Sequence, residues 1–206
     1  MTPEARPEAQ PDTRPGVWVV VGLGNPGPTY AGTRHNIGYA VVDELAGRMG
    51  GQLRAHRSGR AEVLEGRLRV GGPRLVLGRG RSYMNESGGP VASLLAFYKV
   101  PVERLVVVHD ELDLPFGALR LKRGGGDNGH NGLRSVRSAL GSGDFHRVRL
   151  GVGRPAGRQP TADSVLSGYR ASERRDLHEQ VQRAADSVEV LVEEGLEAAQ
   201  QRFNGA

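Results

Sequence analysis

Short apolar runs rich in β-branched residues alternate along this chain with segments of helical periodicity. The runs predict strands at residues 17–23, 61–70, 74–77, 105–108, 118–122 and 145–152. Apolar residues spaced three or four apart predict helices at residues 37–49, 91–98, 133–140 and about 172–203. This alternation predicts an α/β fold, with a mixed, mostly parallel central sheet flanked by helices.

The length and composition of the chain indicate one domain. With 206 residues the chain suits a single core, so we expect residues 17–206 to form one domain. Residues 1–16 are rich in proline, glutamate and arginine and are expected to be a disordered tail. No run of 18 apolar residues and no hydrophobic N-terminal signal is present, so we expect a cytoplasmic protein. Cysteine is absent, which excludes disulfides, thiolate metal sites and a cysteine nucleophile.

The charged residues are unevenly distributed. Residues 117–160 contain nine Lys or Arg and two Asp, a balance of +7. Residues 171–206 contain four Arg and eight Asp or Glu, a balance of −4. This polarity is typical of a protein with one face that meets a polyanion, although a solubilising surface would give the same pattern.

The first predicted strand ends in a glycine-rich segment. Residues 22–27 fit the G-x-G-x-x-G pattern of dinucleotide-binding proteins. That pattern needs a helix opening at its third glycine and an acidic residue at a strand end about twenty residues later. Here Pro28 and Gly32 disrupt such a helix, and Asp43 and Glu44 lie inside an amphipathic one. A nucleotide-dependent dehydrogenase is therefore only a third option.

His35 lies between this glycine-rich loop and the start of a predicted helix, where a lone histidine is more often structural. However, the chain has no G-x-S-x-G, H-E-x-x-H or P-loop motif. A hydrolase of this composition would activate water, for which a histidine base is suited. Asp110 follows a predicted strand and is a candidate acceptor for the other ring nitrogen, although a helix cap would fit as well. Strand alternation points His109 to the opposite face, and we expect it to be structural.

Three asparagines and a glycine run also follow predicted strands. The amides of Asn25, Asn85 and Asn131 can donate and accept hydrogen bonds without charge, which suits a peptide main chain or a tetrahedral intermediate. They do not suit a metal or a phosphate, and Asn85 could merely cap a helix. The glycine run at residues 124–132 would present backbone N–H groups to an anion, or form a flexible loop.

Together these segments resemble the bacterial peptidyl-tRNA hydrolase family. The matching segments are residues 22–27 (GLGNPG), 33–36 (TRHN), 83–88 (YMNESG), 109–115 (HDELDLP) and 124–133, with further similarity at residues 145–151 and 165–169. Each segment alone is weakly specific, but five in this order at natural spacing are highly specific. The resemblance covers nearly the whole chain from residue 17 to the last helix.

The resemblance implies a single-domain α/β monomer, without cofactor or metal, that hydrolyses the ester bond of peptidyl-tRNA and recycles tRNA from stalled translation. It implies no membrane association and no obligate protein partner. His35 would be the general base and Asp110 its orienting acid. Asn25, grouped with these two catalytic residues, would position the peptide and the ester. The implied substrate-binding residues are Tyr30, Tyr83, Met84, Asn85, His130 and Asn131, with Lys122 and Arg149 holding the region of the tRNA 5′-phosphate.

One segment departs from the pattern of the family. The family usually has a proline and a threonine before its Met-Asn pair, whereas residues 78–82 read GRGRS here. We expect this to change the local loop rather than the chemistry. The rival function comes from chloroplast intron-splicing factors, which look like this family but act by binding RNA. The presence of His35, Asp110 and the three asparagines favours the enzyme.

Overall fold

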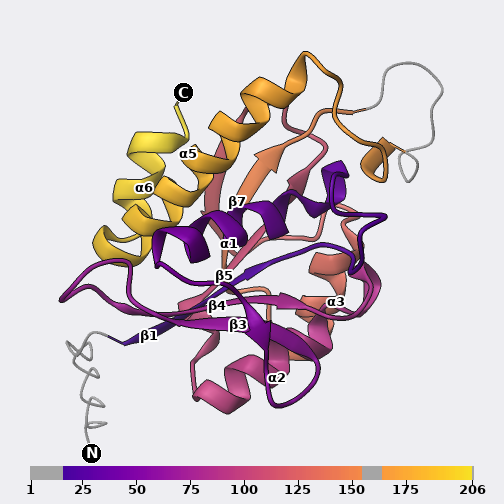
Figure 1. Cartoon of the computed structure of the whole chain (residues 1–206). Helices are drawn as coiled ribbons and strands as arrows, with labels where there is room; N and C mark the ends of the chain where they lie inside the picture. Colours follow the sequence, from indigo (N-terminus) through magenta and orange to yellow (C-terminus); the bar gives the residue numbers. More distant parts are fainter. Residues whose placement is uncertain (1–15, 155–163, 206) are drawn as a thin grey trace, which may run out of the picture.

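The computed structural model describes residues 16–154 and 164–205, so all but Gly16 of the predicted tail lies outside the described residues. Seven strands form one sheet in the order β2-β3-β4-β1-β5-β7-β6 (Figure 1). The strands are β1 (Val17–Gly22), β2 (Arg54–Ala55), β3 (Ala61–Gly66), β4 (Arg74–Gly80), β5 (Leu105–Glu111), β6 (Leu119–Arg123) and β7 (His146–Gly151). The helices are α1 (Ile37–Arg48), α2 (Gly88–Tyr98), α3 (Asn131–Leu140), α5 (Glu173–Glu194) and α6 (Leu196–Phe203), with 3-10 turns η1 (Arg34–Asn36), η2 (Met84–Glu86) and η3 (Val102–Arg104).

The sheet is parallel in its centre and antiparallel at both edges. Strands β4, β1, β5 and β7 pair in parallel, whereas β2–β3, β3–β4 and β6–β7 pair antiparallel. The predicted α/β class with a mixed, helix-flanked sheet is therefore confirmed. Because the carboxyl ends of parallel strands meet at one edge, the loops after β4, β1, β5 and β7 lie close together there.

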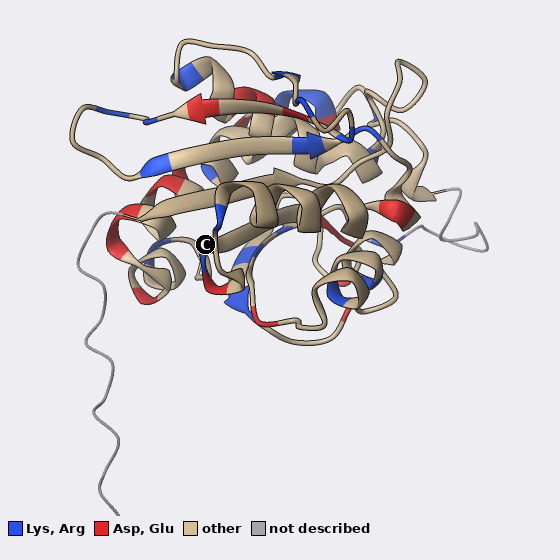
Figure 2. Ribbon diagram, turned by 90° about the horizontal axis from the view of Figure 1, so that it is seen from below, with Lys and Arg blue, Asp and Glu red and all other residues tan. Residues whose placement is uncertain are grey.

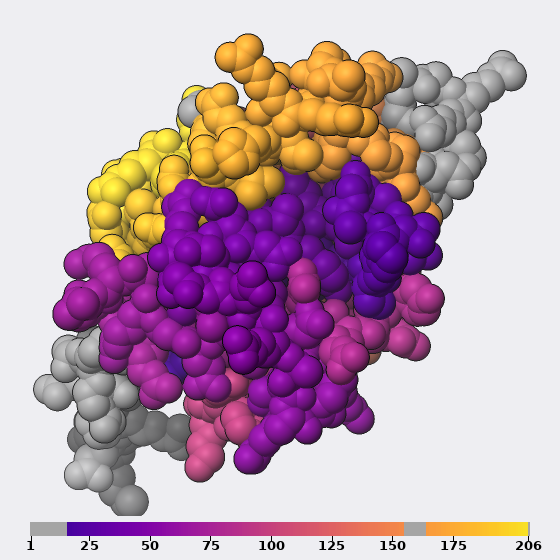
Figure 3. Space-filling view, viewed as in Figure 1, coloured from indigo at the N-terminus to yellow at the C-terminus, as the bar shows by residue number. Residues whose placement is uncertain are grey.

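Helices cover both faces of the sheet in three layers (Figure 1). Side chains of α1, α5 and α6 pack on one face, and those of α2 and α3 pack on the other. The buried strands β1 and β5 contribute alternate residues to the two cores, as period-2 geometry requires. The space-filling view shows the C-terminal helices packed directly against the N-terminal half of the chain (Figure 3).

Several elements differ from the sequence prediction. Strands β4 and β5 run on to Gly80 and Glu111, past the predicted ends at residues 77 and 108. Strand β3 ends at Gly66 rather than at residue 70, because the chain turns at residues 69–72, where Gly71 has a φ of +79°. The single predicted last helix is two helices, since Gly195 has a φ of +94°, outside the helical region. The two-residue strand β2 was not predicted. Within the described ranges, no helix is both long enough and apolar enough to cross a membrane.

Candidate active site

His35 sits on the turn η1, just before α1, at the carboxyl edge of the sheet. The turn approaches the strands closely because Gly38 has no side chain: a Cβ there would lie 2.4 Å from the carbonyl oxygen of Val108. Arg34, the residue before His35, anchors the turn from outside. Its guanidinium donates to Glu173 Oε2 at 2.7 Å and lies 4.8 Å from the centre of the Tyr169 ring. The backbone around His35 is therefore fixed on both sides.

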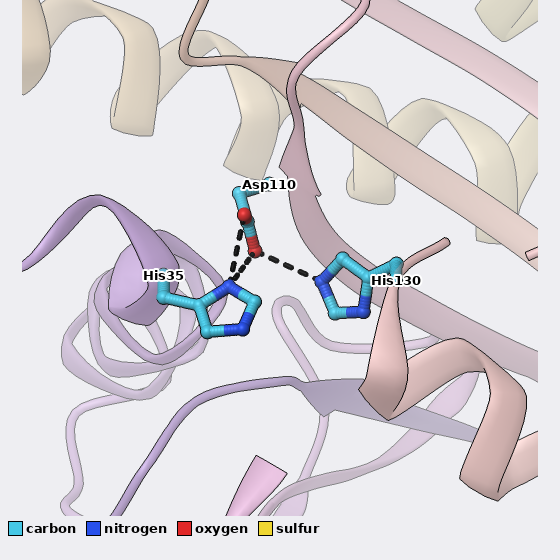
Figure 4. A group of neighbouring side chains, drawn as sticks. All are labelled: His35, Asp110 and His130. Carbon is cyan, nitrogen blue, oxygen red and sulfur yellow. Dashed lines mark hydrogen bonds and ion pairs between the residues drawn. The ribbon is translucent and has the colours of Figure 1, made fainter. Parts of the chain in front are cut away.

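Asp110, near the end of β5, joins two histidines (Figure 4). Nδ1 of His35 lies 2.9 Å from both carboxylate oxygens of Asp110, and Nε2 of His130 lies 2.9 Å from Oδ1. Burial alone would raise the pKa of Asp110, but its interactions with His130 and His35 outweigh this and hold the pKa below the usual range. Asp110 is thus a buried carboxylate, 2% exposed, that accepts from both rings.

The hydrogen bonds of His130 assign its proton. Its Nδ1 accepts from the backbone N–H groups of Gly132 and Leu133 at 3.1 and 3.3 Å, capping α3. Nε2 must then carry the proton and donate to Asp110. Side-chain ligand atoms of His35, Asp110 and His130 lie within 4.8 Å of one another, as metal ligands could. A protonated Nε2 has no lone pair to offer, so this pattern suits an oriented base rather than a metal site.

Asn25 is a buried residue that hydrogen bonds hold in place. Its Oδ1 accepts from the backbone N–H of Met84 at 2.7 Å, and its backbone forms a reciprocal pair with the Asn36 side chain at 2.9 and 2.8 Å. No described residue accepts from Asn25 Nδ2, which leaves the two N–H donors of this amide for a ligand. The oxygen of the Asn25 side chain is therefore engaged by the protein. Met84 is buried and packs against Gly132, so it supports the site from the interior of the protein.

The other predicted ligand-binding residues fall into three places. A cavity of about 290 Å³ is lined by His35, Asp110, His130 and Asn131. Asn85 does not line it; this exposed residue faces Asn131 across a second hollow on the surface. Tyr30 and Tyr83 meet edge to face, with ring centroids 6.3 Å apart. Tyr83 is 57% exposed, which leaves most of its ring open to a ligand.

Lys122 and Arg149 lie on the same sheet face, on neighbouring strands β6 and β7. Arg149 is already paired: two of its nitrogens lie 3.0 and 3.1 Å from Oε2 of the buried Glu111. Lys122 has no carboxylate partner among the described residues. Burial lowers the pKa of Lys122, and the positive charges of Arg149 and Arg147 lower it further. Excess positive charge at this place would be relieved by an anion.

The glycine loop before α3 is arranged differently from the expectation of free N–H groups. Its carbonyl groups at Gly125 and Gly126 accept from the guanidinium of Arg147, which is 1% exposed. The N–H groups of Gly132 and Leu133 are taken by His130, as described above. The side chain of His130 therefore caps α3. The N–H groups of Gly132 and Leu133 are not free to bind an oxyanion.

In the departing segment, residues 78–80 extend β4, and residues 81 and 82 follow the strand. Arg79 donates to Glu62 and Asp43, and Tyr39 donates to the Gly80 carbonyl oxygen at 2.7 Å. These residues and Asn25 line a separate cavity of about 590 Å³. It is larger than the cavity at His35 but contains no histidine, so its size does not make it the catalytic site.

Sequence reasoning missed Arg34, Asn36 and Glu111 as supporting residues. Arg34 and Asn36 flank His35 directly, and both are buried polar residues, 8% and 3% exposed. Their position inside the TRHN segment was the available signal. Glu111 gave no such signal, because its partner Arg149 lies 38 residues away.

Comparison with known proteins agrees with this geometry. The model of the family described as peptidyl-tRNA hydrolase matches residues 19–206. Peptidyl-tRNA hydrolase of Frankia casuarinae is 62% identical over 192 residues, covering 93% of this chain and 96% of the relative; that of Streptomyces coelicolor is 56% identical over 190 residues, covering 91% and 94%. The crystal structure of peptidyl-tRNA hydrolase from Acinetobacter baumannii is 34% identical with a TM-score of 0.84, covering 92% of this chain and 95% of that one. The chain belongs to the peptidyl-tRNA hydrolase family.

Proposed function

We propose that His35 is the general base with which this chain hydrolyses the ester bond of peptidyl-tRNA. The observation that carries the proposal is the contact of His35 Nδ1 with both oxygens of Asp110 at 2.9 Å. An ionised carboxylate there selects the tautomer with the proton on Nδ1 and leaves the lone pair of Nε2 for a water molecule. The His35 side chain is 13% exposed, so water can reach it from the cavity.

The reaction begins when His35 Nε2 takes a proton from water and the resulting hydroxide attacks the ester carbonyl. Asp110 stabilises the imidazolium that forms. The tetrahedral intermediate then breaks its bond to the ribose oxygen, which receives the proton from His35. Free tRNA and a peptide with a C-terminal carboxylate result. The N–H₂ group of Asn25, which lines the neighbouring cavity of about 590 Å³, and the exposed amide of Asn131 hold the peptide carbonyl groups. Tyr30, Tyr83, Met84 and Asn85 bind the substrate outside the cavity at His35.

The proposal extends to the tRNA and to the state of the protein. Lys122 and Arg149 bind the region of the tRNA 5′-phosphate, since Lys122 is a partly buried cation without a carboxylate partner. Residues 17–206 form the hydrolase domain, which acts as a cytoplasmic monomer without a metal, cofactor or obligate protein partner. Light scattering of the purified chain at several concentrations tests the monomer, and activity after treatment with a chelator tests the metal.

The experiment that tests the reaction is release of deacylated tRNA from an N-blocked aminoacyl-tRNA by the parent chain and by His35→Ala. General-base catalysis contributes about 10² to 10⁴ in rate, so His35→Ala should lose that much kcat while tRNA affinity stays near that of the parent. His178→Ala, on the exposed side of α5, is the matched control. A variant that keeps more than about a tenth of the parent kcat would remove His35 from this role. Binding of tRNA without any release by the parent would favour the RNA-binding alternative.

A further inference from the structure

A surface groove runs along α3, away from the catalytic cavity. It is lined by Asn85, Asn131, Arg134, Ser135, Ser138 and Ala139 and has a volume of about 440 Å³. We define this as the α3 groove. Its five α3 residues recur at helical spacing, so they share one face of the helix. All except Arg134 are small or uncharged, which leaves the groove open and polar.

The groove is built by a close approach of α2 to α3. A Cβ at Gly88 would lie 2.2 Å from the carbonyl oxygen of Ser135, so only glycine fits there. The backbone N–H of Gly88 also donates to Ser135 Oγ at 2.9 Å. This contact forms the floor of the groove and brings η2, with Asn85, alongside the first turn of α3.

The α3 groove and the catalytic cavity share Asn131. In contrast, the larger cavity beside Asn25 has no lining residue in common with the cavity at His35. A chain leaving the catalytic cavity past Asn131 therefore enters the α3 groove. From Asn131 to Ser138 the helix rises by about 10 Å, which matches about three residues of an extended peptide.

Arg134 is the one charged side chain among the six that line the groove, and it is weakly engaged. Its side chain is 62% exposed and lies 3.8 Å from Asp127. Asp127 lies closer to Arg137, at 3.2 Å. Its Nη1 also donates to Asn131 Oδ1 at 3.5 Å. Both contacts are long and exposed, so a carboxylate placed in the groove can compete for the Arg134 guanidinium.

We propose that the α3 groove is a subsite for about three peptide residues upstream of the esterified one, and that Arg134 makes it favour acidic side chains. The proposal rests on the proposed function, because the ester at His35 fixes where the peptide starts. Small side chains at Ser138 and Ala139 admit residues of any size, whereas Arg134 discriminates by charge. The substrate class is a peptidyl-tRNA with a carboxylate side chain near its peptide C-terminus.

The test compares two tetrapeptidyl-tRNAs, with Glu or Lys at the second residue upstream of the esterified one, against an N-acetyl-aminoacyl-tRNA that ends before the groove. The rate on the N-acetyl substrate is the reference for each variant. Arg134→Glu should lower the Glu-to-Lys ratio of kcat/KM by about three- to tenfold, because like charges replace an exposed ion pair. Ser138→Trp should lower kcat/KM on both tetrapeptidyl substrates relative to the reference, since its side chain fills the groove.

Arg175→Glu, on the exposed surface of α5, is the matched charge reversal and should keep the parent ratio. The groove proposal would be wrong if Arg134→Glu kept the Glu-to-Lys ratio of the parent and Ser138→Trp kept the parent kcat/KM on both tetrapeptidyl substrates. If the N-acetyl substrate is still hydrolysed in that case, the proposed function stands. If the parent chain released tRNA from none of the three substrates, the proposed function would fail, and the groove with it.

Discussion

At the scale of single residues, Asp110 determines the chemistry because it accepts hydrogen bonds from two histidines at once. We expect Asp110→Asn to lower kcat by about 10² to 10⁴, the range for a general base that has lost its orientation. An amide has one oxygen, so its N–H₂ group would face an N–H of His35 or His130 and force one ring to turn. The measurement is tRNA release alongside thermal melting. Unchanged kcat in a variant with normal melting would make Asp110 a structural acid.

His109, the neighbour of Asp110, gives the molecule a pH-dependent stability. Burial is the largest cause that lowers the pKa of His109, and the nearby His130 lowers it further, to about 3. The unfolded chain has a histidine pKa of about 6.5, so between pH 6.5 and 3 it binds a proton that the folded protein does not. Stability must therefore fall as pH falls through this window, by about 1.4 kcal/mol per pH unit at most from this residue.

We expect His109→Asn to reduce this loss of stability between pH 5.5 and 4.5. Asparagine can keep the donor that reaches the Asp110 carbonyl oxygen, which His109 Nδ1 contacts at 2.7 Å. Urea unfolding at the two pH values measures the difference. The exposed His178→Asn controls for removal of a histidine. An equal loss of stability in the parent and in His109→Asn would show that His109 takes up no proton on unfolding.

At the scale of elements, the contact between α2 and α3 depends on the absence of a side chain at Gly88. We expect Gly88→Ala to destabilise the protein by about 1–3 kcal/mol, as overpacking usually does, because its Cβ would meet the backbone of Ser135. Gly47→Ala is the matched control: it lies inside α1, and a Cβ there has no described atom within 4 Å. That change should stabilise the helix by about 0.5–1 kcal/mol. Urea unfolding distinguishes the two, and a Gly88→Ala variant as stable as the parent would contradict the close contact.

Much of the element layout was predictable, because it depends on local periodicity. The apolar runs predicted β1, β5 and β7. The spacing of Ile37, Val41 and Leu45 predicted α1, because these three residues share the face of the helix that is buried in the core. The length of β3 and the break at Gly195 were not predictable from periodicity. Both depend on backbone angles of single glycines, which a pattern of apolar residues does not record.

The candidate site was predictable in its residues but less so in its contacts. Placing His35 and Asp110 after predicted strands brings them to one edge, and their 2.9 Å contact agrees with that expectation. The capping of α3 by His130 and the pairing of Arg149 with Glu111 were not foreseen. Arg149 and Glu111 are far apart in the sequence, and His130 bonds to the helix that directly follows it. Only the packed structure shows which donor meets which acceptor.

At the scale of the whole molecule, positive and negative charges lie in different segments of the chain, which supports the proposed binding of tRNA. Acidic residues are frequent on the C-terminal helices, whereas basic residues gather on β6 and β7 (Figure 2). Arg147 and Arg149 lie on one face of β7, and Lys122 pairs with Arg147 in the register of β6. The three cations share one nearby buried carboxylate, Glu111, so this face holds more positive charge than it neutralises.

We expect tRNA binding to weaken steeply with salt, and Lys122→Ala to flatten the slope of log K against log[salt] by about 0.7–0.9, the effect of one lost phosphate contact. Lys122 is the cleaner test, because Arg149→Ala would also remove the ion-pair partner of the buried Glu111 and so destabilise the protein. The double variant Arg149→Met/Glu111→Gln removes that destabilisation and should flatten the slope similarly. Binding is measured on a His35→Ala background, so that substrate survives, with Arg175→Ala on α5 as the control. Slopes equal to that of the control in both variants would mean that these cations are ordinary surface charges and that the tRNA 5′ end is held elsewhere.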